Sequence, residues 1–95
     1  MDTIQIGSFG SALDALDVGS RVQRAGWNGK GMFIFLVPRS QFVVNRPPLD
    51  VHFPEGTVIN YQPHVDMYTA DGTVVPWLAS QSDILAQDWQ VLLSD

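Results

Sequence analysis

The sequence predicts a single α+β domain, residues 1–95, in which a small, mostly antiparallel sheet carries two short helices. Three observations favour this class. The dipeptides Asn28-Gly29 and Asp71-Gly72 are typical of hairpin turns and separate apolar runs. Two segments each open on a serine suited to capping a helix. A length of 95 residues suits one domain, although a chain this short buries a modest core and self-association is therefore expected.

Residues 8–19 predict the first helix. Its apolar residues recur at helical spacing and form one face, namely Phe9, Ala12, Leu13 and Leu16. Ser8 is suited to cap the first turn because its hydroxyl accepts an orphaned backbone N–H. Gly19 suits the left-handed conformation that ends helices.

Residues 32–37 predict a buried strand, because Met32-Phe33-Ile34-Phe35-Leu36-Val37 is an unbroken apolar run. The preceding segment, residues 25–31, places three glycines around Asn28-Gly29 and predicts a turn.

Residues 38–63 contain five prolines and predict no long element. Short edge strands are expected at 42–44 and 57–59. The rest of this segment is interpreted either as an ordered excursion over a partner subunit or as a mobile surface loop.

Residues 64–95 predict two strands, a helix and a last strand. Residues 64–69 and 74–77 flank Asp71-Gly72 and read as a hairpin. Ser80 and Asp83 have the spacing of a capping box, which predicts a helix from Ser80 to about Gln87. Residues 89–93 predict the closing strand.

Charge and composition argue against several classes of protein and of binding site. The net charge of −5 argues against DNA or RNA binding, which needs many phosphate contacts from Lys and Arg. The absence of cysteine excludes disulfides and thiolate metal sites. An N-terminus without a signal pattern, and no apolar run long enough to span a membrane, predict a cytoplasmic protein with no membrane partner. The low charged content, 16%, favours buried subunit interfaces.

The usual catalytic patterns are missing from the sequence. His52 and His64 show no metal-ligand spacing, and their expected roles are surface exposure or hydrogen bonding. No nucleophile elbow, phosphate-binding loop or dinucleotide fingerprint occurs. We therefore expect a protein that is not an enzyme and that uses no metal and no cofactor.

Aromatic, amide and glycine residues instead predict a nucleotide pocket. They fall in two loops, the first with Trp27, Asn28, Gly29 and Lys30 and the second with Trp77, Ser80 and Gln81. Indole faces stack on bases, amides match base edges and ribose hydroxyls, and glycine N–H groups reach phosphates. Arg21, Arg24 and Lys30 predict a local positive patch. The alternative is that both tryptophans belong to the core and the glycines only turn the chain.

Two long strings resemble the second Thoeris anti-defence family of small phage proteins. The first runs from Arg24 to Val37 (RAGWNGKGMFIFLV), and the second runs from His64 to Trp89 (HVDMYTADGTVVPWLASQSDILAQDW). The helix at residues 9–16 is also similar. Residues 38–63 lie outside the resemblance, so no contact is carried over to them.

This resemblance implies a sponge that binds a cyclic ADP-ribose-type immune signal, glycocyclic ADP-ribose, and sequesters it without cleavage. The Thoeris effector is then not activated in the cytoplasm of the infected bacterial host. Family members are homotetramers with nucleotide bound where subunits meet, and some also hold cyclic dinucleotides of the CBASS system at a separate site. Trp27 and Trp77 are then expected to wall the base or ribose. The other expected ligand contacts are Asn28, Gly29, Lys30, Asp66, Thr69, Ser80 and Gln81.

Two other classes stay open at this stage. One is an enzyme that degrades such a signal. The other is a structural or protein-interaction module that clamps a host protein, and the acidic surface is compatible with it.

Overall fold

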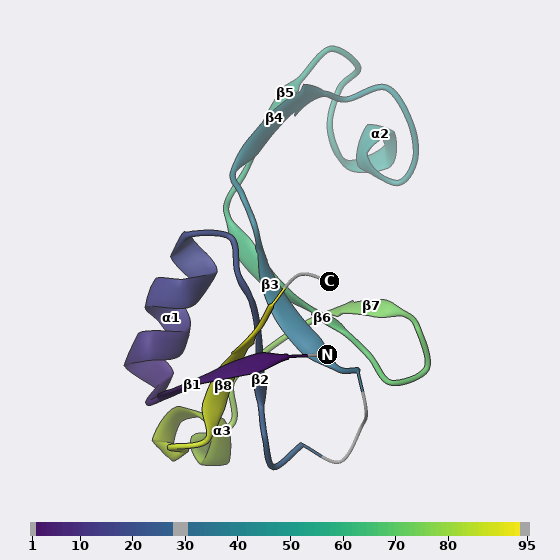
Figure 1. Ribbon diagram of the computed structural model, residues 1–95. Coiled ribbons are helices and arrows are strands. Elements are labelled where there is room, and N and C mark those ends of the chain that lie inside the picture. Colours follow the sequence, from purple (N-terminus) through teal and green to yellow (C-terminus); the bar gives the residue numbers. More distant parts are fainter. Residues whose placement is uncertain (1, 28–30, 94–95) are drawn as a thin grey trace.

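The computed structural model describes residues 2–27 and 31–93, arranged as shown in Figure 1. Within these residues, a six-stranded sheet, a two-stranded sheet and three short helices form the chain. The main sheet has the order β1-β8-β2-β3-β6-β7, and its neighbouring strands are antiparallel. The predicted α+β class is therefore confirmed, with one more short helix than the sequence pattern indicated.

The strands of the main sheet are short, and their bounds are β1 (Thr3–Gly7), β2 (Arg21–Arg24), β3 (Phe33–Val37), β6 (His64–Tyr68), β7 (Val74–Pro76) and β8 (Trp89–Leu92). The last strand lies between β1 and β2, so the two ends of the sequence pair with each other. Strand β1 was not among the predicted elements. Ile4 and Ile6 alternate there with Thr3 and Gln5, which is the period of a strand.

Helix α1 (Phe9–Asp17) follows its sequence signals at both ends. The Ser8 side chain accepts a hydrogen bond from the Ser11 backbone N–H at 3.2 Å. At the other end, the Gly19 N–H donates to the Leu16 carbonyl and the Ser20 N–H donates to the Ala15 carbonyl, each at 3.0 Å. Gly19 has φ +87°, so the helix ends in a Schellman motif that glycine permits.

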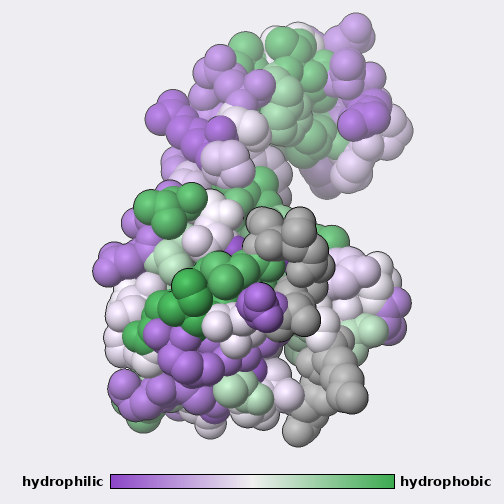
Figure 2. Space-filling model, viewed as in Figure 1, coloured by the Kyte–Doolittle hydropathy of each residue, from purple (hydrophilic) through white to green (hydrophobic). Residues whose placement is uncertain are grey.

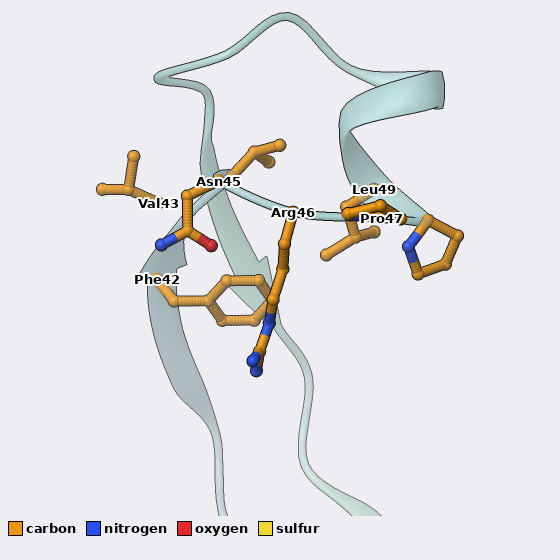
Figure 3. A pocket seen from close by; sticks show the side chains of 8 residues that line it. Phe42, Val43, Asn45, Arg46, Pro47 and Leu49 are labelled. Carbon is orange, nitrogen blue, oxygen red and sulfur yellow. The ribbon is translucent and has the colours of Figure 1, made fainter.

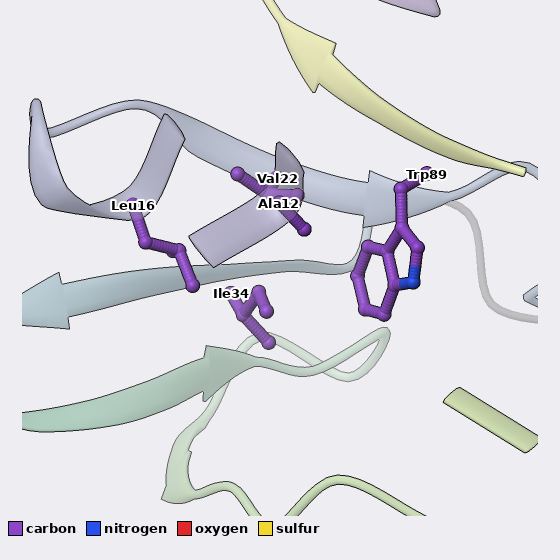
Figure 4. Close-up of a cluster of buried hydrophobic side chains, with 5 residues drawn as sticks. All are labelled: Ala12, Leu16, Val22, Ile34 and Trp89. Carbon is purple, nitrogen blue, oxygen red and sulfur yellow. The ribbon is translucent and has the colours of Figure 1, made fainter. Parts of the chain in front are cut away.

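The core lies between α1 and the main sheet, and Figure 4 shows its five buried side chains, Ala12, Leu16, Val22, Ile34 and Trp89. Two expectations need correction here. Leu13 is 46% exposed, because a helix on a small sheet buries only a narrow stripe. Strand β3 was expected to be buried throughout, but Ile34 is its one fully buried residue, because α1 covers a single face of the sheet.

The face of the sheet opposite α1 carries glutamine and aromatic side chains. The Gln5 and Gln23 side chains both hydrogen-bond to Gln90, which links β1, β8 and β2. On the neighbouring strands, the Phe33 ring stacks on Tyr68 with centroids 5.3 Å apart. Phe33 is half-buried, so this face offers aromatic surface for association.

The C-terminal elements agree with their sequence signals. Strands β6 and β7 pair as the predicted hairpin, with Gly72 at φ +86° in the turn. Helix α3 (Gln81–Leu85) begins with the predicted capping box. The Ser80 hydroxyl accepts from the Asp83 N–H at 3.1 Å, and the Ser80 N–H donates to the Asp83 carboxylate at 3.0 Å.

Residues 38–63 form an arm that projects from the sheet (Figure 1). The arm contains β4 (Ser40–Val43), α2 (Leu49–His52) and β5 (Val58–Tyr61), and β4 pairs with β5. The predicted short strands are confirmed near their expected places, and α2 was not predicted. The radius of gyration is 16.0 Å, against about 12 Å for a compact chain of this length.

The arm exposes apolar side chains, and Figure 2 shows them gathered on its surface beside polar ones. They are Phe42, Val43, Val51, Phe53, Val58 and Tyr61. Within the fully described segment 38–63, Val44 is the one fully buried hydrophobic residue. A two-stranded ladder with so small a core is marginally stable alone in water. The two interpretations of this segment, an excursion over a partner subunit and a surface loop, both stay predictions.

We predict that the main sheet folds without the arm. Val37 and His64 are register partners at the root of the arm, so an Asn-Gly dipeptide can replace residues 38–63 as a hairpin turn. The shortened chain should keep a cooperative thermal transition by circular dichroism. Loss of that transition would contradict an independent sheet body.

Candidate ligand-binding site

All three tryptophans of the chain meet in one cluster beside the core. The Trp89 ring is fully buried, and the Trp27 and Trp77 rings pack edge-on against it, with centroids 5.4 and 6.2 Å away. The centroids of Trp27 and Trp77 are 6.5 Å apart. The two predicted ligand residues, Trp27 and Trp77, therefore lie together. Both also pack against the core, as the alternative interpretation of the two tryptophans held.

Asp83 holds this cluster together through both its side chain and its backbone. The carboxylate accepts hydrogen bonds from the Arg24 guanidinium at 3.0 Å and from the Trp27 indole N–H at 3.4 Å. Its backbone carbonyl accepts from the Trp89 indole N–H at 2.9 Å. Asp83 is 8% exposed, so one buried residue orients two of the three indoles. The sequence indicated Asp83 only as a capping-box residue.

Asp88 fixes the loop that leads to Trp27. Its carboxylate accepts from the Arg24 Nε at 2.9 Å and from the Gly26 backbone N–H at 2.8 Å. A Cβ at Gly26 would lie 2.8 Å from the same carboxylate, so a side chain at this position would displace the carboxylate from its present contacts. The predicted positive patch is thereby reduced, because the charge of Arg24 is paired with two carboxylates.

The charges of this network stabilise one another. Burial alone would raise the pKa of Asp83, but hydrogen bonds from the Ser80 backbone and from Arg24 outweigh it and hold that pKa below its ordinary value. The hydrogen bond from Arg24 likewise lowers the pKa of Asp88. Both carboxylates are therefore ionised at neutral pH.

A hollow of about 370 Å³ lies at the edge of the sheet beside β6 and β7. Asp66 and Trp77, two of the predicted ligand residues, both line it. Tyr61 and His64 line it as well and were not among the predicted contacts. His64 was expected to be a surface or hydrogen-bonding residue, and its Nδ1 does lie 3.1 Å from the Gln62 carbonyl oxygen.

The other predicted residues lie outside this lining. Thr69 hydrogen-bonds with Asp71 and Thr73 in the β6–β7 turn. Ser80 caps α3, and Gln81 is exposed at the start of that helix. Because the capping box already occupies the first turn, the expected attraction of an anion to this short helix end has no support in the geometry. The ligand roles of these residues stay predictions.

The positions of Asn28, Gly29 and Lys30 lie outside the described residues, so the expected contacts of these three residues also stay predictions.

A second hollow, of about 750 Å³, lies in the arm. Figure 3 shows Phe42, Asn45, Arg46 and Leu49 on its wall. It combines an aromatic ring, an amide and a guanidinium, which are groups that contact planar or anionic molecules.

Comparison with known proteins decides the family. Residues 7–92 match the Thoeris anti-defense 2-like domain. The chain belongs to the Thoeris anti-defense 2-like family. A relative named Thoeris anti-defense 2, from Bacillus phage SP01, is 39% identical over 88 residues, which cover 90% of this chain and 93% of the relative. The predicted family is thereby confirmed, and membership supports a phage anti-defence role in the host cell.

Among residues 2–27 and 31–93, no helix has the length and hydropathy needed to cross a bilayer. In the same part of the chain, His, Asp and Glu side chains do not gather in groups of three or more that would suit a metal ion.

We predict that Asp83→Asn destabilises the protein by about 2–3 kcal/mol, because it removes one of the two carboxylates paired with Arg24 and the charged acceptor of the α3 cap. The matched control is Asp14→Asn on the exposed side of α1, with an expected change within about 0.5 kcal/mol. Urea denaturation measures both variants. Equal stability of the two variants would contradict the role of Asp83.

Proposed function

We propose that this family member is a phage sponge that binds a cyclic ADP-ribose-type signal, glycocyclic ADP-ribose, and sequesters it without cleavage. In the cytoplasm of the infected bacterium, the Thoeris effector then receives no signal. The observation that carries this proposal is the hollow at the β6–β7 edge, whose lining includes Asp66 and Trp77. A carboxylate suits ribose hydroxyls and an indole suits a base, so the pair matches the two halves of a nucleoside.

The size of the hollow supports a site completed by another subunit. Its volume of about 370 Å³ lies near the lower end of the range for small-molecule sites, about 300–1,000 Å³. One chain therefore encloses only part of a ligand as large as cyclic ADP-ribose. We propose a homotetramer in which the exposed apolar arm and the aromatic face around Phe33 and Phe35 form subunit contacts.

A sponge works by affinity alone. Binding alone requires no stabilisation of a transition state, so the proposed activity requires no catalytic group in the hollow. It must hold the signal more tightly than the effector does, and a thousandfold ratio of affinities corresponds to about 4 kcal/mol. Enclosure between subunits strengthens hydrogen bonds to the ligand by excluding water.

The direct test uses lysate from cells with an activated Thoeris sensor. The purified protein is mixed with the lysate, the mixture is filtered, and the filtrate is assayed for effector activation before and after the retained protein is heated. We predict loss of activation by the filtrate and its recovery from the heated protein. No loss would contradict binding, and loss without recovery would indicate that the signal is degraded.

Asp66→Asn should weaken binding of glycocyclic ADP-ribose by about tenfold or more, because hydrogen bonds to a charged group contribute about 1.5–3 kcal/mol. Asp17→Asn, at the exposed end of α1, makes the same chemical change away from the hollow and should bind as the parent does. Titration calorimetry measures both affinities. Equal affinities of the two variants would remove Asp66 from the site.

Two further binding roles follow from particular features. The arm hollow lined by Phe42 and Arg46 supports the proposal of a separate site for the cyclic dinucleotides of the CBASS system. The exposed apolar arm also supports the second candidate function, a module that clamps a host protein. A folded protein that leaves the signal in the filtrate and retains a host protein through the arm would favour that candidate.

A further inference from the structure

Strand β1 forms one outer edge of the main sheet, and among the described residues its one strand partner is β8. Across this ladder the Leu93 N–H donates to the Asp2 carbonyl at 2.9 Å. Hydrogen-bonded pairs alternate along an antiparallel ladder, so the backbone N–H and C=O groups of Thr3 and Gln5 point away from β8. These groups are therefore directed outward, where a further strand could pair with them.

The two outer edges of the main sheet differ in their capacity to pair. The opposite edge, β7, is three residues long and ends on Pro76, which has no N–H to donate. Strand β1 has five residues and contains no proline and no charged side chain. Its Ile4 side chain is 51% exposed. Strand β1 thus lacks the features that usually prevent an edge from pairing.

A second copy of β1 fits this edge when Thr3 of one copy faces Gln5 of the other. Each such pair then exchanges both of its backbone hydrogen bonds. The two-fold axis passes beside Ile4, so the two exposed Ile4 side chains face each other as a non-hydrogen-bonded pair, in which side chains lie closest. A register centred on Gln5 would instead use Gly7, where φ is +83° and the ladder is irregular.

The side chains on both faces of β1 suit this register. Ile6 packs against the core on the α1 side, and Ile4 extends the same apolar face to the edge. On the other face, the Gln5 side-chain amide donates to Gln90. The oxygen of that amide can accept a hydrogen bond from the Thr3 hydroxyl of the other copy.

Charge also favours an uncharged contact of this kind. The net charge of −5 makes two copies repel each other wherever acidic residues meet. In the register with Thr3 facing Gln5, Asp2 faces Ile6 of the other copy. The two Asp2 residues are then offset along the strands by about 13 Å, given a rise of about 3.3 Å per residue. This exceeds the Debye length of about 8 Å at physiological ionic strength, so their repulsion is largely screened.

We propose that β1 is a self-association edge, at which two copies of the chain join their main sheets into one continuous antiparallel sheet with Ile4 at the two-fold axis. This contact is separate from those proposed above for the arm and for the aromatic face of the sheet. It requires no nucleotide. The exposed backbone groups of Thr3 and Gln5 become paired, and the half-exposed Ile4 side chain becomes buried.

The test uses the full chain with one introduced cysteine. Because the sequence contains no cysteine, a single thiol can form a disulfide only with another copy. The Cα atoms of a non-hydrogen-bonded pair are about 4.5 Å apart, which a disulfide can span. Ile4→Cys should therefore form a covalent dimer in most chains under mild oxidation, as measured by non-reducing gel electrophoresis and intact mass.

Two other single-cysteine variants are the matched controls. Val74→Cys places the thiol on the opposite edge strand, where Val74 is 54% exposed. Thr3→Cys moves the thiol by one residue, to a position whose two copies are diagonal neighbours about 8 Å apart, beyond the reach of an unstrained disulfide. Both controls should form covalent dimers about tenfold more slowly than Ile4→Cys.

A second pair of variants tests the edge without a cross-link. Ile4→Lys places two like charges at the two-fold axis and removes the apolar contact, so the dissociation constant for self-association should rise about tenfold. Val74→Lys should leave it unchanged. Sedimentation velocity measures both constants, and circular dichroism should show the parent's thermal transition in both variants.

The outcomes separate this proposal from the proposed function. Equal cross-linking rates for Ile4→Cys and Val74→Cys would overturn the role of the edge, and faster cross-linking of Thr3→Cys would overturn the register. A parent that sediments as a single chain would overturn self-association and leave the edge to a strand of another protein. Each readout is made without nucleotide, so none of these results bears on sequestration of the signal.

Discussion

The buried carboxylate of Asp83 is the constraint on which the rest of this structure depends. It ties the cap of α3 to Arg24 on β2 and to the indole of Trp27, while its carbonyl receives the indole N–H of Trp89. A charge this buried is stable only when it is fully hydrogen-bonded, so the surrounding elements must keep one arrangement. That arrangement positions Trp89, against which Trp77 packs at the wall of the hollow. The candidate site is therefore joined to the core, because Trp77 both lines the hollow and packs against Trp89.

Sequence signals located the elements whose ends depend on local chemistry. The Ser8 cap, Gly19 and the Ser80–Asp83 capping box each act within a few residues, and each has the geometry that its spacing indicated. Strand β1 and the burial of β3 depend on distant partners. β1 is completed by β8 at the other end of the chain, and α1 covers only one face of β3. The alternation of residues 3–6 is a local signal for a strand, but the pairing of β1 with β8 and the one-sided burial of β3 are not encoded locally.

The residues of the candidate site also divide into those that the local sequence indicated and those that depend on distant contacts. The residue types at Trp27 and Trp77 indicated aromatic walls, and the fold brings both rings to one cluster. Asp83, which hydrogen-bonds Trp27 and Trp89, was indicated only as a cap, because its ion pair with Arg24 joins residues 59 positions apart. Tyr61 and His64 line the hollow because β5 ends at Tyr61 and the chain enters β6 at His64, at the root of the arm. An Asp two residues after a His in a strand is the local signal that could have placed His64 beside Asp66.

The central claim is that Trp77 and Asp66 form part of a cage for an intact nucleotide where copies of the chain meet. A crystal structure of the protein with glycocyclic ADP-ribose tests it most directly. The account predicts an uncleaved ligand in contact with Trp77 and Asp66 and enclosed by a second copy. Ligand density in the arm beside Phe42 and Arg46 alone, or density for a cleaved product, would contradict it.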